Sequence, residues 1–282
     1  MEALRQDTRG IVAAPRLLSR VRFRRRAPAP ALRRHVEHYW LIDWDLPVPY
    51  TSRVFTHPCV NLALRLSDGA VESEAVGPLH RLFETRLSGH GRVSGVQFRP
   101  GAFRSFSGAA CSPAALADRR LPLDEALPGS RDAADAVLAA AGDDARVAAL
   151  DALLAPHGPV PDAATARAMA LAHRVRTDRT LRRVDQLAHA AGLSVRSLQR
   201  LFATVHGIGP KRLIRRYRLL DALEHATTEP RPDWGRLAGD LGYSDQSHLV
   251  REFTAAVGVP PDGYVRTLTT PPPSEYSTGA AG

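Results

Sequence analysis

The sequence predicts an α+β protein with a β-rich N-terminal domain, trailing helices, and an all-α C-terminal domain of two helix-turn-helix units joined by a long helix. Short β-type runs occupy residues 36–107, whereas a helical hydrophobic period dominates residues 163–267. Between these regions, residues 156–161 (PHGPVP) contain three prolines and one glycine, which is typical of a domain boundary. A length of 282 residues suits one large domain or two ordinary ones.

The composition excludes several classes of protein. Hydrophobic residues make up 44% and charged residues 24%, which rules out extensive disorder. No stretch approaches the roughly 20 uninterrupted apolar residues of a membrane-spanning helix, and the N-terminus lacks the apolar core of a secretory signal. The two cysteines, Cys59 and Cys111, fit neither a disulfide framework nor a paired-cysteine zinc site. We therefore expect a cytoplasmic protein with no membrane partner, no metal and no cofactor.

The net charge of +9 is divided unevenly along the chain. Residues 1–26 carry +6 and residues 159–282 carry +5, whereas residues 27–158 carry −2. A near-neutral middle followed by a basic C-terminal part is typical of a sensor joined to a nucleic-acid-binding domain. A soluble basic surface without such a partner is the alternative reading.

The N-terminal half is predicted to begin with a flexible basic arm over residues 1–30, because this segment is rich in arginine and ends in APAP. A β-rich sensor or dimerisation domain is expected over 31–158. Its candidate strands are 38–45, 52–55, 59–66, 70–76 and 92–98, separated by glycine and proline turn signals. Residues 113–155 are rich in alanine and leucine and are expected to be helical.

The C-terminal half contains an internal repeat. Leu187-Ala188, Gly192 and Ser194 recur 50 residues later, and Leu198, Arg200, Phe202, Gly207 and Pro210 recur 51 residues later. The slip of one residue falls just after Ser244. Each copy reads as a short helix, a turn containing glycine, a second helix and then Gly-x-x-Pro, which is a helix-turn-helix layout.

The first copy has the chemistry of such a unit. Helical spacing places four apolar residues on one face of each helix; these are Val184, Leu187, Ala188 and Ala191, then Leu198, Leu201, Phe202 and Val205. Gly192 suits the positive φ that ends a helix, and Ser194 suits the next N-cap. The second helix then directs Arg196, Gln199 and Arg200 away from the core.

The second copy follows the same plan. Its first helix buries Trp234, Leu237, Ala238 and Leu241, and its second buries Leu249, Phe253 and Val257. Ser244 is the expected N-cap of the second helix, whose outer face has Gln246, Ser247, Val250 and Arg251 as candidates. A longer helix marked by Leu213, Tyr217, Leu220 and Leu223 connects the two units.

Residues 164–267 resemble the DNA-binding region of the AraC family of bacterial transcription regulators. The resemblance rests on GLSVRSLQRLF, on GIGPKRLIRRYRL and above all on LAGDLGYSDQSHLVREFTAAVGVPPDGYVR. Leu249 replaces a common phenylalanine, and Pro260 precedes Pro261. The resemblance implies an AraC-type DNA-binding domain over 163–268, followed by a disordered tail over 269–282.

The resemblance further implies that the two second helices enter successive major-groove segments, which lie roughly 34 Å apart. Arginine can bind guanine and glutamine can bind adenine through paired hydrogen bonds. We therefore assign base contacts to Arg196, Gln199 and Arg200 in one half-site and to Gln246, Ser247 and Arg251 in the other. Solvation or pairing with phosphates is the alternative for each of these residues.

Phosphate contacts are assigned to Arg212, Arg215, Arg216 and His248, with a solvated helix face or packing as the alternative. Double-stranded DNA is the expected partner. RNA polymerase, a small-molecule effector and a second copy of the chain are further candidates. The sequence is compatible with either activation or repression.

The N-terminal half gives weaker signals. RLSGHGRVSGVQFRPGAF and the segment 58–66 are similar to uncharacterised domains that precede AraC-type regions. Trp40, Trp44, Phe55 and Phe98 are candidates for an apolar effector pocket, although isolated aromatic residues in strands are more often core. The histidines of this region, His35, His38, His57, His80 and His90, match no metal-ligand spacing.

The leading hypothesis is a non-enzymatic, sequence-specific transcription regulator. One rival is an AraC-like DNA-repair alkyl acceptor that uses Cys59 as a thiolate. Cys59 lies in HPCVN, and in a strand His57 would share its face, but the Pro-Cys-His-Arg context of such acceptors is missing. A second rival is an architectural DNA binder of low specificity, which outward-facing glutamine and arginine in both units argue against.

Overall fold

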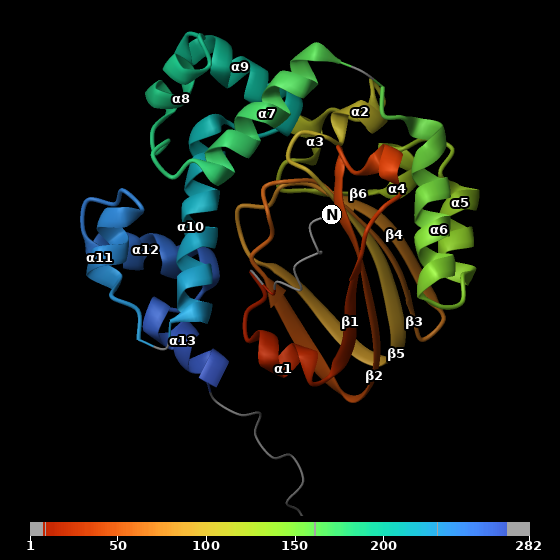
Figure 1. Ribbon diagram of the computed structural model, residues 1–282. Coiled ribbons are helices and arrows are strands. Elements are labelled where there is room, and N and C mark those ends of the chain that lie inside the picture. Colours follow the sequence, from red (N-terminus) through yellow and green to blue (C-terminus); the bar gives the residue numbers. More distant parts are fainter. Residues whose placement is uncertain (1–7, 9, 161, 230, 270–282) are drawn as a thin grey trace, which may run out of the picture.

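The computed structural model describes residues 8, 10–160, 162–229 and 231–269. An N-terminal antiparallel sheet domain with trailing helices precedes an all-α domain, as predicted (Figure 1). The last helix, α13, ends at Thr269, so the prediction of a disordered tail over 269–282 is wrong at its first residue, and the rest of that tail falls outside the described residues. None of the described helices is both long and apolar enough to cross a membrane.

Six strands form one sheet in the order β1-β2-β5-β3-β4-β6. They are β1 (Val21–Arg26), β2 (Val36–Val54), β3 (Asn61–Ser67), β4 (Ala70–Val76), β5 (Phe83–Phe98) and β6 (Arg120–Pro122). The runs expected at 38–45 and 52–55 belong to the single long strand β2, and 92–98 is the end of β5. The register of β2 against β5 shifts between Leu46 and Tyr50. Two prolines lie there and cannot donate to the ladder, so the strand is irregular at this point without turning.

The helices of the C-terminal domain follow the predicted order, whereas the first two helices of the chain lie in segments where no helix was expected. The N-terminal domain has α1 (Ala14–Leu18), α2 (Arg104–Ser107), α3 (Pro113–Leu116), α4 (Leu123–Ala126), α5 (Arg131–Ala139) and α6 (Asp143–Leu154). The C-terminal domain has α7 (Ala163–Thr177), α8 (Val184–Ala190), α9 (Val195–His206), α10 (Pro210–Thr228), α11 (Trp234–Asp240), α12 (Gln246–Val257) and α13 (Pro261–Thr269). The short strand β6 interrupts the region expected to be helical over 113–155.

The period of two in the strands divides the sheet into two different faces. Tyr39 and Leu41 of β2 point to the face covered by α5 and α6, where they join a buried apolar cluster (Figure 1). Trp40 and Trp44 alternate with them and belong to a separate cluster on the opposite face. This second face carries the candidate pocket described below.

The prediction of a flexible arm over residues 1–30 is wrong for the part of this segment that the structure describes. Residues 14–18 form α1, and residues 21–26 pair with β2 as the edge strand β1. Ile11, Leu17 and Val21 are buried in the cluster on the tryptophan-bearing face of the sheet. The apolar residues spaced between the arginines therefore anchor this segment to the sheet.

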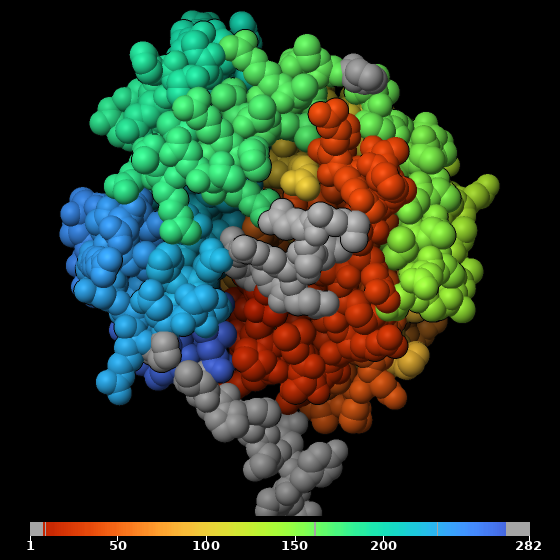
Figure 2. Space-filling view, viewed as in Figure 1, coloured from red at the N-terminus to blue at the C-terminus, as the bar shows by residue number. Residues whose placement is uncertain are grey.

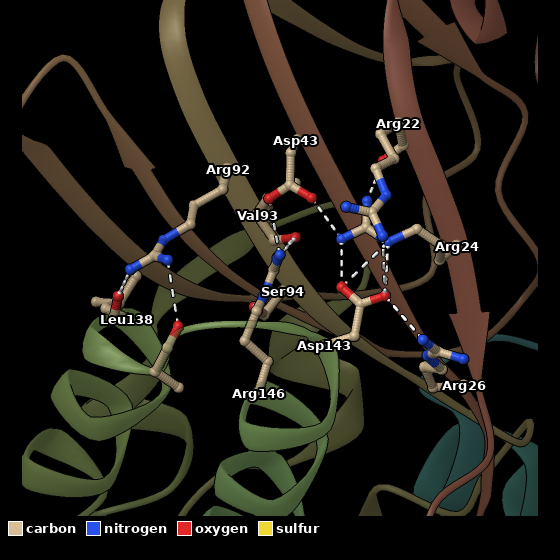
Figure 3. A network of polar contacts seen from close by, with 11 residues as sticks. Arg22, Arg24, Arg26, Asp43, Arg92, Val93, Ser94, Leu138, Asp143 and Arg146 are labelled. Atoms are coloured by element: carbon tan, nitrogen blue, oxygen red, sulfur yellow. Dashed lines mark hydrogen bonds and ion pairs between the residues drawn. The ribbon is translucent and has the colours of Figure 1, made fainter.

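Two arginines of β1, Arg24 and Arg26, are neutralised within the N-terminal domain (Figure 3). Arg24 donates to both carboxylate oxygens of Asp143 at the start of α6, at 2.9 and 2.6 Å, and to Asp43 of β2. Arg26 donates to Asp143 at 2.8 Å. The hydrogen bonds from Arg24 hold the pKa of Asp143 at about 2. These contacts join the edge strand to the helical layer.

Arg146 of α6 is the buried centre of the same network (Figure 3). Its side chain donates to Asp43 at 2.8 Å, to the Ser94 hydroxyl at 2.8 Å and to the Val93 carbonyl at 2.6 Å. The guanidinium thus satisfies polar groups of two central strands that the helix would otherwise cover without partners.

Replacing Arg146 by alanine should destabilise the protein by about 3 kcal/mol, because the removal of one member leaves buried polar groups without partners. Urea unfolding followed by circular dichroism measures the change. Arg131→Ala is the matched control, since Arg131 is exposed at the start of α5, and it should stay within about 0.5 kcal/mol of wild type. Equal stability of the Arg146 variant and the control would contradict the structural role.

Candidate nucleic-acid interface

The first helix-turn-helix unit consists of α8 and α9. Leu198, Phe202 and Val205 of α9 are buried, as the helical spacing predicts. Gly192 has φ +62° in the turn, and the Ser194 hydroxyl accepts from the Ser197 amide at 3.1 Å. The turn and the N-cap predicted from the repeat are therefore confirmed.

The opposite face of α9 is open to solvent. Arg196, Gln199 and Arg200 are all exposed. The buried residues of α9 lie on its other side, so these three polar side chains occupy the side of the helix away from the core. Their assignment to DNA bases stays a prediction.

The second unit consists of α11 and α12 and repeats this geometry with one correction. The N-cap of α12 is Asp245, whose carboxylate accepts from the His248 amide at 2.7 Å. Ser244, the expected cap, donates to the Asp245 carboxylate instead. The extra residue of the second repeat thus lies within the turn. Asp245 takes the structural place of Ser194, and the two are 51 positions apart, which is also the offset between the helices α9 and α12.

The outer face of α12 presents Gln246, Ser247 and Arg251, all exposed. His248 is 41% exposed and is held on both sides, because Nδ1 lies 3.1 Å from the Ser244 hydroxyl and Nε2 lies 3.4 Å from Glu252. Leu249 and Phe253 fill the inner face. His248 is therefore at the edge of the exposed face, and its phosphate contact stays a prediction.

The arginines of the connecting helix α10 have different surroundings. Arg215 is half exposed and pairs with Glu252 of α12 at 2.9 Å. Arg212 makes two hydrogen bonds to Asp118, at 2.6 and 2.8 Å, and these bonds connect α10 to the N-terminal domain. Partial burial opposes the ionisation of Asp118, yet hydrogen bonds from Arg212 and His80 hold its pKa at about 2.

Arg216 departs furthest from expectation. It is only 5% exposed, and its guanidinium lies 3.4 Å from the centre of the Phe55 ring. It donates to the Thr56 carbonyl at 2.8 Å and to the His80 carbonyl at 3.3 Å. The expected phosphate contact of Arg216 is therefore not available in this arrangement. The helical period alone could not reveal this, because the partners belong to the other domain.

A cavity of about 190 Å³ lies on the tryptophan-bearing face of the sheet. Trp40, Trp44 and Phe55 line it, as three of the four aromatic candidates were expected to do. Phe98 is the exception, because it points to the opposite face and is buried against Phe103 and Phe106. The register of β2 against β5 shifts between Val36 and His38, beside Phe98. The alternation of apolar and polar residues in the sequence does not reveal this shift.

The two tryptophans lie against glycines of the neighbouring strand. Trp40 faces Gly95 and Trp44 faces Gly91 in the register of β2 and β5. A Cβ atom at either glycine would come within 2.2 Å of an indole carbon. Any residue larger than glycine at position 91 or 95 would therefore displace the indole ring that faces it. The matched spacing of two tryptophans and two glycines, four residues apart in each strand, was a sequence signal for this floor.

Charged residues border the apolar floor. Arg65 lies 3.8 Å from Glu72 and 5.4 Å from the centre of the Trp44 ring, and Arg120 lies 3.4 Å from Glu74. The Arg65 Nε atom is buried and has no hydrogen-bond partner among the described residues. Burial raises the pKa of Glu74. The cavity thus combines ring faces with charged side chains at its border.

Cys59 lies outside this cavity and is 2% exposed. Burial raises the pKa of its thiol to about 12. Residues 55–60 lie between β2 and β3, so the strand geometry expected to place His57 beside Cys59 is wrong. Among the described residues, no group of three or more histidine, cysteine or acidic side chains is placed to hold a metal ion.

Two domain families match the chain. Residues 187–267 match a family described as a helix-turn-helix domain. Residues 24–122 match a domain of unknown function. No curated protein matches the chain.

Solved structures resemble the chain more distantly. The C-terminal domain of AraT, a response regulator from Geobacillus stearothermophilus, is 21% identical, with a TM-score of 0.35, and 42% of this chain covers 97% of it. ToxT from Vibrio cholerae is 10% identical, with a TM-score of 0.43, and 89% of this chain covers all of it. A structure of an apo ToxT variant from the same organism is 12% identical, with a TM-score of 0.41, 82% coverage of this chain and 97% of that one.

The corrected N-cap gives a direct test of the second unit. Asp245→Ala should cost about 1 kcal/mol of unfolding free energy, because it removes the acceptor for an orphan amide of α12. Ser244→Ala should change stability by at most a few tenths of a kcal/mol. Thermal and urea unfolding of the full chain measure both. A larger loss for the Ser244 variant would assign the cap to Ser244.

Proposed function

We propose that this chain, a DNA-binding transcription regulator with an AraC-type helix-turn-helix domain over residues 187–267, reads two successive major-groove segments with α9 and α12. We also propose that a small molecule bound in the N-terminal cavity controls this binding. The proposal also includes RNA polymerase and a second copy of the chain as binding partners of this protein.

The observation that carries the proposal is the matched pair of exposed polar helix faces. Each second helix buries an apolar stripe and leaves arginine and glutamine on the opposite side. The two units lie toward opposite ends of α10 (Figure 1). This helix has 19 residues, which corresponds to a length of about 28 Å. That length is of the same order as the roughly 34 Å between successive major-groove segments.

The exposed residue types favour base recognition. Arg200 and Arg251 occupy equivalent positions in the two helices and can each donate two hydrogen bonds to guanine. Arg196 and Gln199 complete the first reading face, and Gln246 and Ser247 complete the second. Arg215 and His248 remain candidates for phosphate contacts because both keep solvent exposure.

The cavity favours a ring-containing, largely apolar effector that carries a hydrogen-bond acceptor. Trp40 offers a ring face for stacking, and the guanidinium of Arg65, which also lines the cavity, offers a cation. A pocket that is mostly apolar with a few placed polar groups is the usual form of a small-molecule site.

The alkyl-acceptor alternative has no support from the surroundings of Cys59. Alkyl transfer needs an accessible thiolate, whereas this thiol is buried and its pKa is raised to about 12. An architectural binder of low specificity is the remaining competitor, and DNA selection separates it from the proposal.

The decisive experiment is selection of bound sequences from a random duplex library by the full-length protein at near-physiological salt. Enrichment of two short blocks about one helical turn apart supports the proposal. Salt-sensitive binding without enrichment, both alone and with cavity ligands added, would favour the architectural binder.

Arg200→Ala and Arg251→Ala should each relax sequence preference at one half-site, at a cost of about 1–3 kcal/mol for a bidentate base contact. Fluorescence anisotropy with the selected duplex and with single-base variants measures the loss. Arg86→Ala is the control, because Arg86 is an exposed arginine of β5. If either variant keeps the wild-type preference, that base contact is wrong.

Ala63→Phe should block the cavity, because Ala63 lines it and faces Gly95 across the sheet. Binding of 1-naphthoic acid, a ring with a carboxylate, should quench tryptophan fluorescence of the wild type and not of this variant. Trp234→Phe should retain the quenching, since Trp234 lies in the C-terminal domain. Quenching that is lost only in the Trp234 variant would place the probe elsewhere.

A further inference from the structure

The two helix-turn-helix units are attached to the N-terminal domain in different ways. The end of α9 is pressed against α3, where a Cβ on Gly207 would lie 2.1 Å from the Pro113 carbonyl. His206 is also buried here, close to Gly101. The first unit is thus in tight backbone contact with the N-terminal domain.

The second unit has a lighter direct attachment. A hydrogen bond from the Tyr264 hydroxyl to the Ile11 carbonyl, at 3.3 Å, joins its side of the molecule to the N-terminal domain. Figure 2 shows dark-blue atoms near the end of the described chain against red atoms of the N-terminal domain. Apart from this contact, α10 and two hydrogen bonds from Arg182 to the Gly239 and Asp240 carbonyls link the second unit to the rest of the molecule.

On one side of α10, Arg216 contacts the wall of the cavity. Its guanidinium covers one face of Phe55 and donates to both the carbonyl and the hydroxyl of Thr56, at 2.8 and 3.2 Å. Phe55 and Thr56 both line the cavity. A ligand that touches these two residues therefore changes the groups that hold Arg216 in place.

The preceding residue of α10, Arg215, contacts the second recognition helix. Arg215 forms an ion pair with Glu252, with Nε 2.9 Å from one carboxylate oxygen, and the other oxygen of Glu252 lies 3.4 Å from His248 Nε2. Glu252 is only 17% exposed, so this ion pair is better shielded than a typical surface pair. His248 stands directly between Ser247 and Leu249 on α12.

We propose that Arg216 is a positioning residue that couples the occupant of the cavity to the second recognition helix, through α10 and the Arg215–Glu252–His248 contacts. The inference rests on the proposed function. Its specific content is asymmetry: the cavity controls recognition of the second half-site, and the first half-site is read independently of it.

The test uses the full chain and the duplex selected by the wild type, together with two duplexes in which one half-site is scrambled. The affinity ratio between intact and scrambled duplexes gives the contribution of each half-site. Arg216→Leu should reduce the contribution of the second half-site about tenfold, within the usual range of coupling between sites. The contribution of the first half-site should change less than twofold. Lys211→Leu, an exposed position on the same helix, should change neither contribution.

Two further variants separate positioning from a loss of folding. Phe55→Leu keeps an apolar residue in the wall but removes the ring beneath the guanidinium, and it should reduce the same ratio in the same direction. Arg216→Lys keeps the charge and should restore part of the loss. The Arg216→Leu, Phe55→Leu double variant should lose little more than Arg216→Leu alone, because both changes break one contact. Circular dichroism identifies any variant that does not fold.

Equal losses at both half-sites, or no loss in any of the folded variants, would overturn the inference and leave the proposed function intact. Failure of the wild type to select a site would instead overturn the proposed function. Adding 1-naphthoic acid to the wild type should change the contribution of the second half-site alone. The same change in Arg216→Leu would show that the ligand acts by another route.

Discussion

A buried cation costs free energy unless nearby groups replace its lost hydration. Arg216 is buried between the domains, where two carbonyl oxygens, one hydroxyl and the face of Phe55 surround its guanidinium. These groups all belong to the N-terminal domain, so the guanidinium is satisfied only when the domains are in contact. The buried guanidinium of Arg146 is compensated differently, because it pairs with the carboxylate of Asp43, which belongs to the same domain as Arg146. The placement of α10, and with it the placement of the second unit, therefore depends on the wall of a cavity in another domain.

Most of the C-terminal domain was predictable because its determinants are local. The apolar stripes of α9 and α12, the Ser194 cap and the positive φ of Gly192 all follow from residues within a few positions of one another. The error at the second cap also has a local cause. Ser244 and Asp245 are both good caps, and only the turn geometry decides which carboxylate or hydroxyl reaches the His248 amide.

The predictions that failed depend on contacts between distant residues. The charged segment at the N-terminus forms an edge strand whose apolar residues are buried and whose Arg24 and Arg26 pair with Asp143, more than a hundred residues away. Phe98 lies outside the cavity because the pairing of Trp40 with Gly95 puts the cavity on the other face of β5, whereas Phe98 shares the face of Val96. Arg216 is buried because α10 meets the loop after β2. No periodicity within a segment encodes these pairings, whereas the tryptophan and glycine spacing of β2 and β5 was present in the sequence and identifies the cavity floor.

The distribution of ion pairs changes what the basic charge of the chain means. Net charge favours binding to a polyanion only where the cations are free to meet it. Arg24 and Arg26 are committed to Asp143, and Arg212 is committed to Asp118. The exposed arginines of α9 and α12 have a different status, because each projects from the side of its helix opposite the core. The arginines of β1 that pair with Asp143 therefore hold the fold together, whereas Arg196, Arg200 and Arg251 of α9 and α12 stay exposed on the faces away from the core. The helices α9 and α12 are joined through α10, so a change in the position of α10 alters the relation between the two exposed faces without altering either face.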